Sequence, residues 1–270
     1  IIVANLDGKY LVMKKNILDA SVSTLQFRKL LFFIIVALVS TLMTPASFSS
    51  TQIANKSYST SINGLWFKPS FNSIENTTVR KEVFFNYLLP AVIEKNIEIT
   101  KLRELIINDK LDELELEELA IKYRLNLPIT KEDLLIAIDV LPPSLVLAQA
   151  ANESNWGRSR FAEDFNNYFG IWCFVKGCGI VPTKRDMNDK HEVATFDSLK
   201  DCVDYYVLTL NRNYAYQNLR AIRKSQRDNL SPVTGIALAE GLKGYAEIGE
   251  EYVNVIQAVI SFNNLERHDL

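Results

Sequence analysis

One segment, residues 144–157, constrains the fold more than any other part of the chain. Its apolar residues occur on every side of a helix and leave little polar surface, so a helix formed here is stable only when it is buried. Gly157 is a natural position for such a helix to stop. The sequence therefore predicts a buried helix whose apolar residues are Leu145, Val146, Leu147, Ala148, Ala150 and Ala151.

The chain is large enough to bury a substantial core, because it has 270 residues, of which 48% are hydrophobic. One or two domains fit this length. The formal net charge of −2 lacks the basic excess that a nucleic-acid-binding protein uses to neutralise phosphates. We therefore expect no nucleic acid partner, whereas a neutral polymer such as a glycan is compatible with this charge.

An apolar run near the start of the chain is the strongest localisation signal. Basic residues, including Arg28 and Lys29, precede the apolar residues 30–43. This run is shorter than the ~20 residues of a membrane-spanning helix, and the small polar residues 45–50 suit a cleavage site. Residues 1–12 precede Met13, which resembles a natural start. Residues 1–47 are therefore predicted to hold a spurious extension plus a cleaved signal peptide, with a retained membrane anchor as the alternative.

Residues 48–76 are rich in Ser, Asn and Thr without a sustained apolar period, which is typical of a linker. Helical patterns begin at Thr77, and Pro90 is expected to kink or break the first helix. A second helix is expected over residues 111–123, where the acidic run is interpreted as a solvated face rather than a metal site. Thr130 and Asp133 resemble a capping box that opens a third helix. Residues 77–140 thus form a predicted helical N-terminal region.

The helical period disappears between residues 177 and 195. Strand-forming residues at 180–181 and 193–195 flank the turn-prone residues 186–189, which predicts a β-hairpin. Helical patterns return over residues 198–210 and again over residues 235–260. The predicted fold class is mainly α with one small hairpin, an α+β arrangement.

The cysteines are compatible with export. Cys173 and Cys178 enclose a short loop and can form a disulfide in an oxidising compartment. A zinc site is the rival interpretation, but it lacks ligands, because His191 and His268 are the chain's two histidines. Cys202 shares a helical face with apolar residues and is predicted to be a buried thiol rather than a catalytic one. No nucleotide-binding loop or metal cluster is apparent, so no cofactor is expected.

Glu153 is the carboxylate whose surroundings best suit chemistry. It lies in the last turn of the apolar helix, three residues before Trp156, where apolar packing and the helix dipole favour the protonated form. A protonated carboxylic acid is what a departing glycosidic oxygen requires. A glutamate that simply faces water is the competing interpretation. The nearby Asn167, Phe169 and Trp172 favour a sugar-binding groove, in which they are candidate substrate contacts.

At these residues the chain resembles the Bax-type branch of the glucosaminidase family, glycoside hydrolase family seventy-three. The matching blocks are AQAANESNWG at 148–157, NNYFGIWC at 166–173 and GYAEIGEEY at 244–252, together with FFNYL at 84–88. The resemblance covers about residues 78–265, and three ordered blocks are a specific signal.

This resemblance implies a lysozyme-like helical lobe, a small β-hairpin lobe and a substrate cleft between them, with a catalytic domain over residues 141–265. It implies hydrolysis of the β-1,4 bond after N-acetylglucosamine in peptidoglycan, and hence a periplasmic location, free or tethered to the inner membrane. The general acid of the family falls on Glu153, and its essential tyrosine falls on Tyr245. Tyr216 corresponds to another tyrosine of the family, either structural or substrate-binding.

The second carboxylate of the family lies on the hairpin, where Glu192 and Asp186 both qualify. Glu192 is preferred because its direction is set by alternation in a strand, whereas Asp is common at turns for local bonding alone. Inverting, retaining and substrate-assisted mechanisms all stay open. A lytic transglycosylase is the nearest alternative enzyme, and a non-catalytic wall-binding protein is the alternative from a different class.

Overall fold

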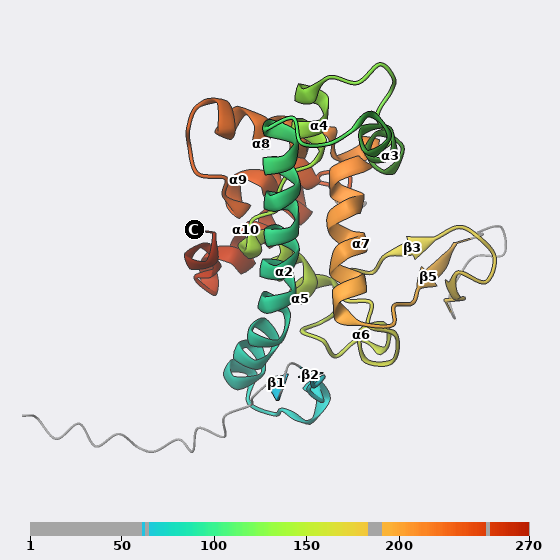
Figure 1. Cartoon of the computed structure of the whole chain (residues 1–270). Helices are drawn as coiled ribbons and strands as arrows, with labels where there is room; N and C mark the ends of the chain where they lie inside the picture. The colour runs from blue at the N-terminus through green and yellow to red at the C-terminus, as the bar shows by residue number, and fades with distance from the viewer. Residues whose placement is uncertain (1–60, 63–64, 183–190, 247–248, 270) are drawn as a thin grey trace, which may run out of the picture. The chain divides into compact units, whose positions relative to one another are not determined.

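The computed structural model of the chain describes residues 61–62, 65–182, 191–246 and 249–269 (Figure 1). The predicted signal segment and Asp186 lie outside these residues. Tyr58–Leu270 forms one compact unit that is mainly helical with a small three-stranded sheet, so the predicted fold class is confirmed. None of the helices in the described ranges is both long and apolar enough to span a membrane.

The first helix, α2, spans Thr77–Ile107, and the Asn76 side chain caps it by accepting a hydrogen bond from the Val79 amide at 3.1 Å. The sequence predicted that Pro90 would kink or break this helix. The helix continues through Pro90, so the predicted break is wrong. A proline inside a helix removes one backbone hydrogen bond. Buried residues on both sides of Pro90, among them Leu88 and Val92, offset that loss by packing against α5 and α7.

The buried helix predicted from the sequence is α5, Pro143–Glu153, and every residue from 143 to 151 is buried. It packs against α2, α9 and α10, which cover its different sides. Ser154 ends it, because its hydroxyl donates to the Ala150 oxygen at 2.6 Å and accepts from the Gly157 amide at 2.8 Å. Gly157 has φ +78°, and a Cβ there would lie 2.3 Å from the Phe71 ring, so only glycine fits.

The remaining helices pack around this centre. The predicted capping box at Thr130 is confirmed at the start of α4. The prediction of a single helical stretch over residues 235–260 is wrong, because Gly249, at φ +51°, separates α10 from the helices before it.

The remaining α-helices are α3 Glu113–Tyr123, α4 Lys131–Ala137, α6 Arg160–Phe165, α7 Leu199–Arg212, α8 Gln217–Asp228, α9 Gly235–Ala239 and α10 Glu250–Phe262. The 3-10 helices are η1 Phe71–Ser73, η2 Tyr214–Tyr216, η3 Glu240–Leu242 and η4 Leu265–His268.

The predicted hairpin is present as β4, Gly179–Ile180, paired antiparallel with β5, Glu192–Ala194. A third strand, β3, Trp172–Cys173, pairs with the other edge of β5, so the order is β3-β5-β4. We call this sheet and the loop from Cys173 to Cys178 the β lobe. The sequence did not predict β3, because a two-residue strand is too short to show an alternating pattern.

The end of the predicted linker is folded. Strands β1, Ser61–Ile62, and β2, Leu65–Trp66, pair antiparallel, and η1 follows. Phe71 in η1 is buried, with its ring 5.5 Å from that of Phe84 and 5.8 Å from that of Tyr87. Lys68 Nζ also donates to the Ala162 oxygen and Asn72 Nδ2 to Glu163 Oε2, both at 2.6 Å, so the segment is attached to the helical core at several points within the predicted linker, residues 48–76.

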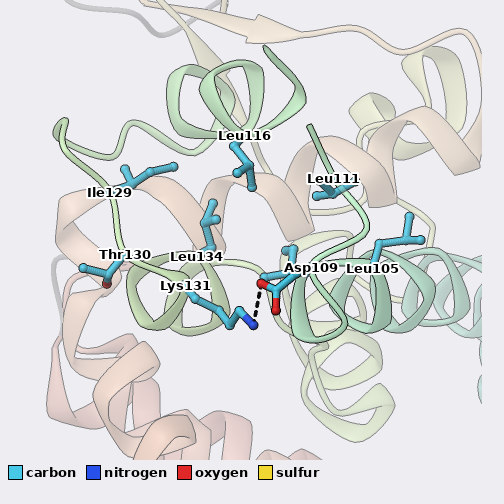
Figure 2. A pocket seen from close by; sticks show the side chains of 9 residues that line it. Leu105, Asp109, Leu111, Leu116, Ile129, Thr130, Lys131 and Leu134 are labelled. Carbon is cyan, nitrogen blue, oxygen red and sulfur yellow. Dashed lines mark ion pairs between the residues drawn. The ribbon is translucent and has the colours of Figure 1, made fainter. Parts of the chain in front are cut away.

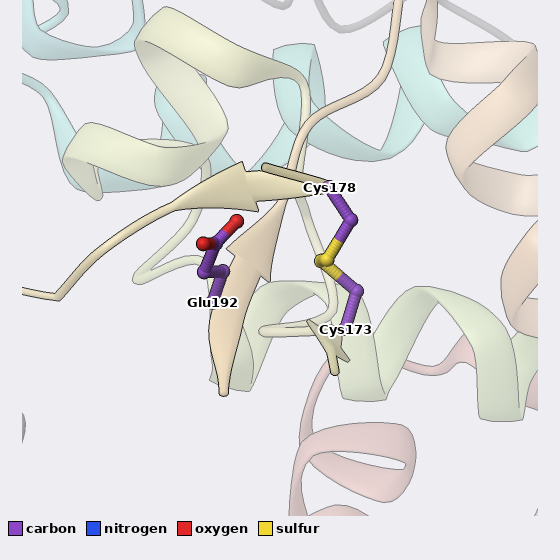
Figure 3. A group of neighbouring side chains, drawn as sticks. All are labelled: Cys173, Cys178 and Glu192. Atoms are coloured by element: carbon purple, nitrogen blue, oxygen red, sulfur yellow. A yellow bond between two sulfur atoms is a disulfide. The ribbon is translucent and has the colours of Figure 1, made fainter. Parts of the chain in front are cut away.

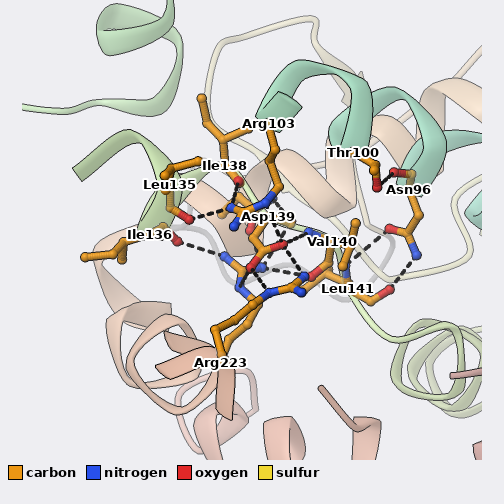
Figure 4. A network of polar contacts seen from close by, with 12 residues as sticks. Asn96, Thr100, Arg103, Leu135, Ile136, Ile138, Asp139, Val140, Leu141 and Arg223 are labelled. Atoms are coloured by element: carbon orange, nitrogen blue, oxygen red, sulfur yellow. Dashed lines mark hydrogen bonds and ion pairs between the residues drawn. The ribbon is translucent and has the colours of Figure 1, made fainter. Parts of the chain in front are cut away.

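A buried charge cluster attaches α2 and α4 to α8 (Figure 4). The Asp139 carboxylate lies 2.8 Å from Arg227 Nη2, 3.3 Å from Arg103 Nε and 3.7 Å from Arg223 Nε. Arg223 is itself buried, and its side chain donates to the backbone oxygens of Asp139 and Val140, both at 3.1 Å. The predicted N-terminal region, residues 77–140, is therefore joined to the predicted catalytic domain by ionic contacts within one compact unit.

Candidate active site

A cleft of about 770 Å³ lies between the β lobe and the helices. The end of α5, the segment after Tyr168, one face of α7 and residues near η2 form its walls. The described residues that line it are Arg124, Glu153, Phe161, Phe169, Gly170, Ile171, Trp172, Cys173, Phe174, Val175, Val193, Tyr205, Tyr206, Thr209, Leu210, Arg212, Asn213, Tyr216 and Tyr245. Aromatic and apolar side chains with a few polar groups are typical of a ligand site.

Glu153 is half-buried at the C-terminal end of α5 and contributes to the cleft lining. Its Oε1 accepts a hydrogen bond from the Tyr252 hydroxyl at 2.7 Å and another from Asn152 Nδ2 at 3.2 Å. Its Oε2 lies on the side of Gly170, where a Cβ would be 3.5 Å away. The two oxygens of this carboxyl group therefore have different surroundings.

A buried hydrogen-bond chain holds Glu153 in this orientation. The Tyr206 hydroxyl donates to Gln149 Oε1, and Gln149 Nε2 donates to the Tyr252 hydroxyl at 2.9 Å, which in turn donates to Glu153. Burial raises the pKa of both tyrosine hydroxyls, so they stay neutral donors. Four residues from α5, α7 and α10 thus form a connected network with the carboxylate at its end.

The sequence did not identify the roles of Gln149, Tyr206 and Tyr252. One signal was present, because Gln149 lies four residues before Glu153 and therefore on the same face of an otherwise apolar helix. The two tyrosines gave no such signal, since Tyr206 resembled an ordinary core residue and Tyr252 was simply the last residue of a matching block.

The predicted catalytic Tyr245 lies in the cleft wall. Its hydroxyl donates to the Phe169 backbone oxygen at 2.8 Å, and its ring stacks on that of Tyr252 at 5.4 Å. Burial raises the pKa of Tyr245 well above its usual value, and the neighbouring Tyr252 adds to this. Tyr216 also lines the cleft, and burial followed by the nearby Glu153 charge raises its pKa to about 12. Both side chains are therefore neutral donors beside Glu153.

The three predicted sugar contacts separate into two groups. Phe169 and Trp172 line the cleft; Phe169 stacks on Tyr206 at 3.9 Å, and Trp172 is 53% exposed. Asn167 is buried and is absent from the cleft lining. Its Nδ2 donates to the Ile171 and Ala194 oxygens, both at 2.9 Å, so it joins the loop after α6 to β5.

Glu192 lies within the β lobe, and it is not among the described residues that line the cleft. Its side chain accepts hydrogen bonds from the amides of Gly177 at 3.0 Å and Gly179 at 2.9 Å. Cys173 and Cys178 beside it are joined by a disulfide (Figure 3). In the described ranges these three residues are the group close enough to share a metal ion, but the disulfide leaves no thiolate to bind one.

The comparisons with known proteins agree on one family. A family model described as mannosyl-glycoprotein endo-beta-N-acetylglucosaminidase matches residues 132–265. The Escherichia coli (strain K12) protein called Protein bax is 30% identical over 207 residues, which are 72% of this chain and 74% of that protein. The chain belongs to the glucosaminidase family. The match to the family model begins in α4, so it includes part of the predicted helical N-terminal region, residues 77–140.

A solved structure was also found for comparison with this chain. The crystal structure of the catalytic domain of the autolysin Auto from Listeria monocytogenes is 19% identical, with a TM-score of 0.42. The alignment covers 93% of the present chain and 99% of that chain.

A second hollow, of about 240 Å³, lies among α2, α3 and α4 (Figure 2). Most of its lining is aliphatic, and its charged residues, Lys131 and Asp109, pair with each other at 2.6 Å. Because these charges are already paired, this hollow offers no group for catalysis, and the cleft at Glu153 is the candidate active site.

Replacing Glu192 by glutamine is expected to destabilise the protein. Glu192 is 6% exposed, and each of its two carboxylate oxygens accepts from one backbone N–H group. Glutamine would have a single side-chain oxygen for these two donors. Losing one of these hydrogen bonds, and with it the charge that strengthens both, costs about 1.5–3 kcal/mol, so the melting temperature should fall by several degrees. Thermal unfolding of Glu192→Gln checks this. An unchanged melting temperature would contradict a structural role for the carboxylate.

Proposed function

We propose that this protein is a peptidoglycan hydrolase, an endo-β-N-acetylglucosaminidase that cleaves the β-1,4 bond after N-acetylglucosamine with Glu153 as general acid. The orientation of Glu153 carries this proposal, because its carboxyl group lies in the cleft and is held by a buried hydrogen-bond chain. A general acid needs a carboxyl group in a defined position beside the leaving oxygen. Family membership supports the same assignment.

The hydrogen bonds also suggest which oxygen carries the proton. Oε1 already accepts from Tyr252 and Asn152, so a proton on that oxygen would disturb both contacts. Oε2 lies toward Gly170, which lines the cleft, and is the better carrier. The glycosidic oxygen would then approach from the Gly170 side of the cleft. Trp172 is proposed to pack against a sugar ring there, and Tyr216 to donate a hydrogen bond to the substrate. Phe169 is 1% exposed and stacks on Tyr206, so it is proposed to shape the cleft wall. Tyr245 can donate to the substrate only by releasing the Phe169 oxygen.

The second carboxylate is proposed to be Glu192 or Asp186. The hydrogen bonds from Gly177 and Gly179 to Glu192 favour a structural role for it, which gives Asp186 more weight than the sequence did. Comparing Glu192→Gln with Asp186→Asn separates them. The catalytic partner should lose far more turnover than its loss of folded protein explains, and thermal unfolding of each variant measures that loss. If neither variant loses turnover, the acetamido group of the substrate becomes the better candidate for the second role.

The products distinguish this enzyme from a lytic transglycosylase. Mass spectrometry of fragments released from purified sacculi should find reducing ends on N-acetylglucosamine. Anhydromuramic ends would overturn the proposed hydrolysis. Since the substrate lies in the cell wall, we also propose that the protein acts outside the cytoplasm, in agreement with the signal segment predicted from the sequence.

Replacing Tyr252 by phenylalanine is expected to lower kcat about tenfold with little change in KM. The hydroxyl is a positioning group that is buried and does not line the cleft, so its loss should affect the orientation of Glu153 rather than substrate binding. The lost hydrogen bond to Glu153, about 1–1.5 kcal/mol, corresponds to this factor, while the bond lost from Gln149 should lower the melting temperature. Steady-state kinetics on soluble glycan strands measures it. Tyr214→Phe, at a mostly exposed tyrosine, is the matched control. Equal kcat values for both variants would refute the positioning role.

A further inference from the structure

The cleft has an excess of positive charge. Among its described lining residues, Glu153 is acidic, and Arg124 and Arg212 are basic. The other lining side chains are uncharged at neutral pH. The cleft therefore has the opposite sign of net charge from the whole chain, whose formal charge is −2. A binding site whose net charge opposes that of its protein points to a charged ligand.

Both arginines lie where α3 meets α7. Arg212 is the last residue of α7, and Arg124 directly follows α3, which packs against α7 (Figure 1). A cation is favoured at a helix C-terminus by the helix dipole, and this accounts for a basic residue at either position. It does not account for both residues lining one cleft, because a helix end can place its cation toward solvent equally well.

Neither guanidinium group is used by the fold within the described part of the chain. Arg212 lies 5.8 Å from the centre of the Tyr205 ring, and Arg124 is exposed. No ion pair or side-chain hydrogen bond engages either group there. Other arginines of the helical core differ: Arg220, for example, donates to the Leu210 and Asn213 oxygens at 2.9 and 2.8 Å. The two cleft arginines thus keep their hydrogen-bond donors available for a ligand.

We propose that Arg124 and Arg212 form a carboxylate-binding subsite that recognises the anionic substituents of the glycan strand. The inference rests on the proposed function and specifies its substrate class. A plain N-acetylglucosamine polymer has no ionised group, whereas each muramic acid carries a lactyl carboxyl group, either free or extended by a peptide with its own carboxylates. A guanidinium group binds a carboxylate through two parallel hydrogen bonds. The cleft therefore selects strands that carry carboxylates.

The test compares two forms of the same soluble strands: native peptide-bearing strands, and strands whose carboxyl groups have been converted to neutral amides. Wild-type enzyme should show a kcat/KM at least about fivefold higher on the native strands, as expected for partly exposed ion pairs. This ratio should approach one in the Arg124→Gln, Arg212→Gln double variant. Because both rates come from one enzyme preparation, incomplete folding of a variant changes both alike and leaves the ratio intact.

Lys122→Gln is the matched control, because Lys122 is an exposed cation in the last turn of α3 that does not line the cleft. It should keep the wild-type ratio. Raising the salt concentration should lower the wild-type ratio, since screening weakens exposed ion pairs. Equal rates of the wild type on native and amidated strands, or a double variant that keeps the wild-type ratio, would overturn the subsite.

A third substrate identifies the source of the carboxylate. Strands from which an amidase has removed the peptides keep only the lactyl carboxyl group. If the wild type prefers these strands over amidated strands, the subsite binds the lactyl group. If it shows no preference, the subsite binds the peptide carboxylates. Binding of the native and amidated strands to Glu153→Gln is measured in parallel. If the wild type releases no fragments, the proposed function fails, while the binding ratio still tests the subsite.

Discussion

Glu153→Gln is expected to lower kcat by about 10²–10⁴-fold while binding to peptidoglycan sacculi is largely retained. Glutamine keeps the shape of the side chain and an oxygen that can accept from Tyr252, but it has no proton to transfer to a leaving oxygen. The loss should therefore appear in turnover and not in binding. Fragment release and sedimentation with sacculi measure the two quantities separately.

Glu251→Gln is the matched control for this experiment. Glu251 is exposed on α10, directly before Tyr252, and lies outside the cleft lining. It should keep wild-type turnover. Thermal unfolding of both variants establishes that a loss of turnover is not a loss of folded protein. Residual fragment release by Glu153→Gln close to that of the wild type would exclude Glu153 as the general acid.

Asp139→Asn is expected to destabilise the protein by about 3–5 kcal/mol, the cost of removing one partner from a buried ion pair. Arg223 is buried, and burial lowers its pKa to about 10, so it stays charged at neutral pH and needs the Asp139 carboxylate. Arg103 and Arg227 contact the same carboxylate. The melting temperature should fall by roughly 6–20 °C for a unit of this size.

Asp228→Asn is the control for that variant, because Asp228 pairs with Lys224 at 2.7 Å at the surface of α8. Its melting temperature should match that of the wild type, since exposed ion pairs are screened by water. If Asp139→Asn unfolds as a single transition, α2, α4 and α8 belong to one cooperative unit with the cleft. Two separate transitions would instead show that the predicted helical N-terminal region, residues 77–140, unfolds apart from the cleft.

Local chemistry explains which features the sequence could predict. The α5 helix was predictable because its apolar residues leave no face for water, and the α4 start because a capping box involves residues only three apart. Strands β4 and β5 were predictable because a turn separates two β-forming segments. Each of these signals lies within a short window of the chain. Features that join distant segments, such as the burial of Phe71 against α2, left no comparable signal.

The candidate site likewise has features that the sequence could predict and features that it could not. The sequence alone determined that Glu153 lies in the last turn of a buried helix and that aromatic residues follow it, because both are properties of neighbouring residues. The structure ends this helix at Glu153, four residues before the predicted stop at Gly157. Only the tertiary structure decided what holds the carboxyl group, since Tyr206 and Tyr252 reach it from α7 and α10 through Gln149. It also decided that Asn167 and Glu192 bond to backbone groups of the β lobe and its adjoining loop. Hydrogen-bond partners depend on packing between elements, and residue spacing in the sequence does not contain that information.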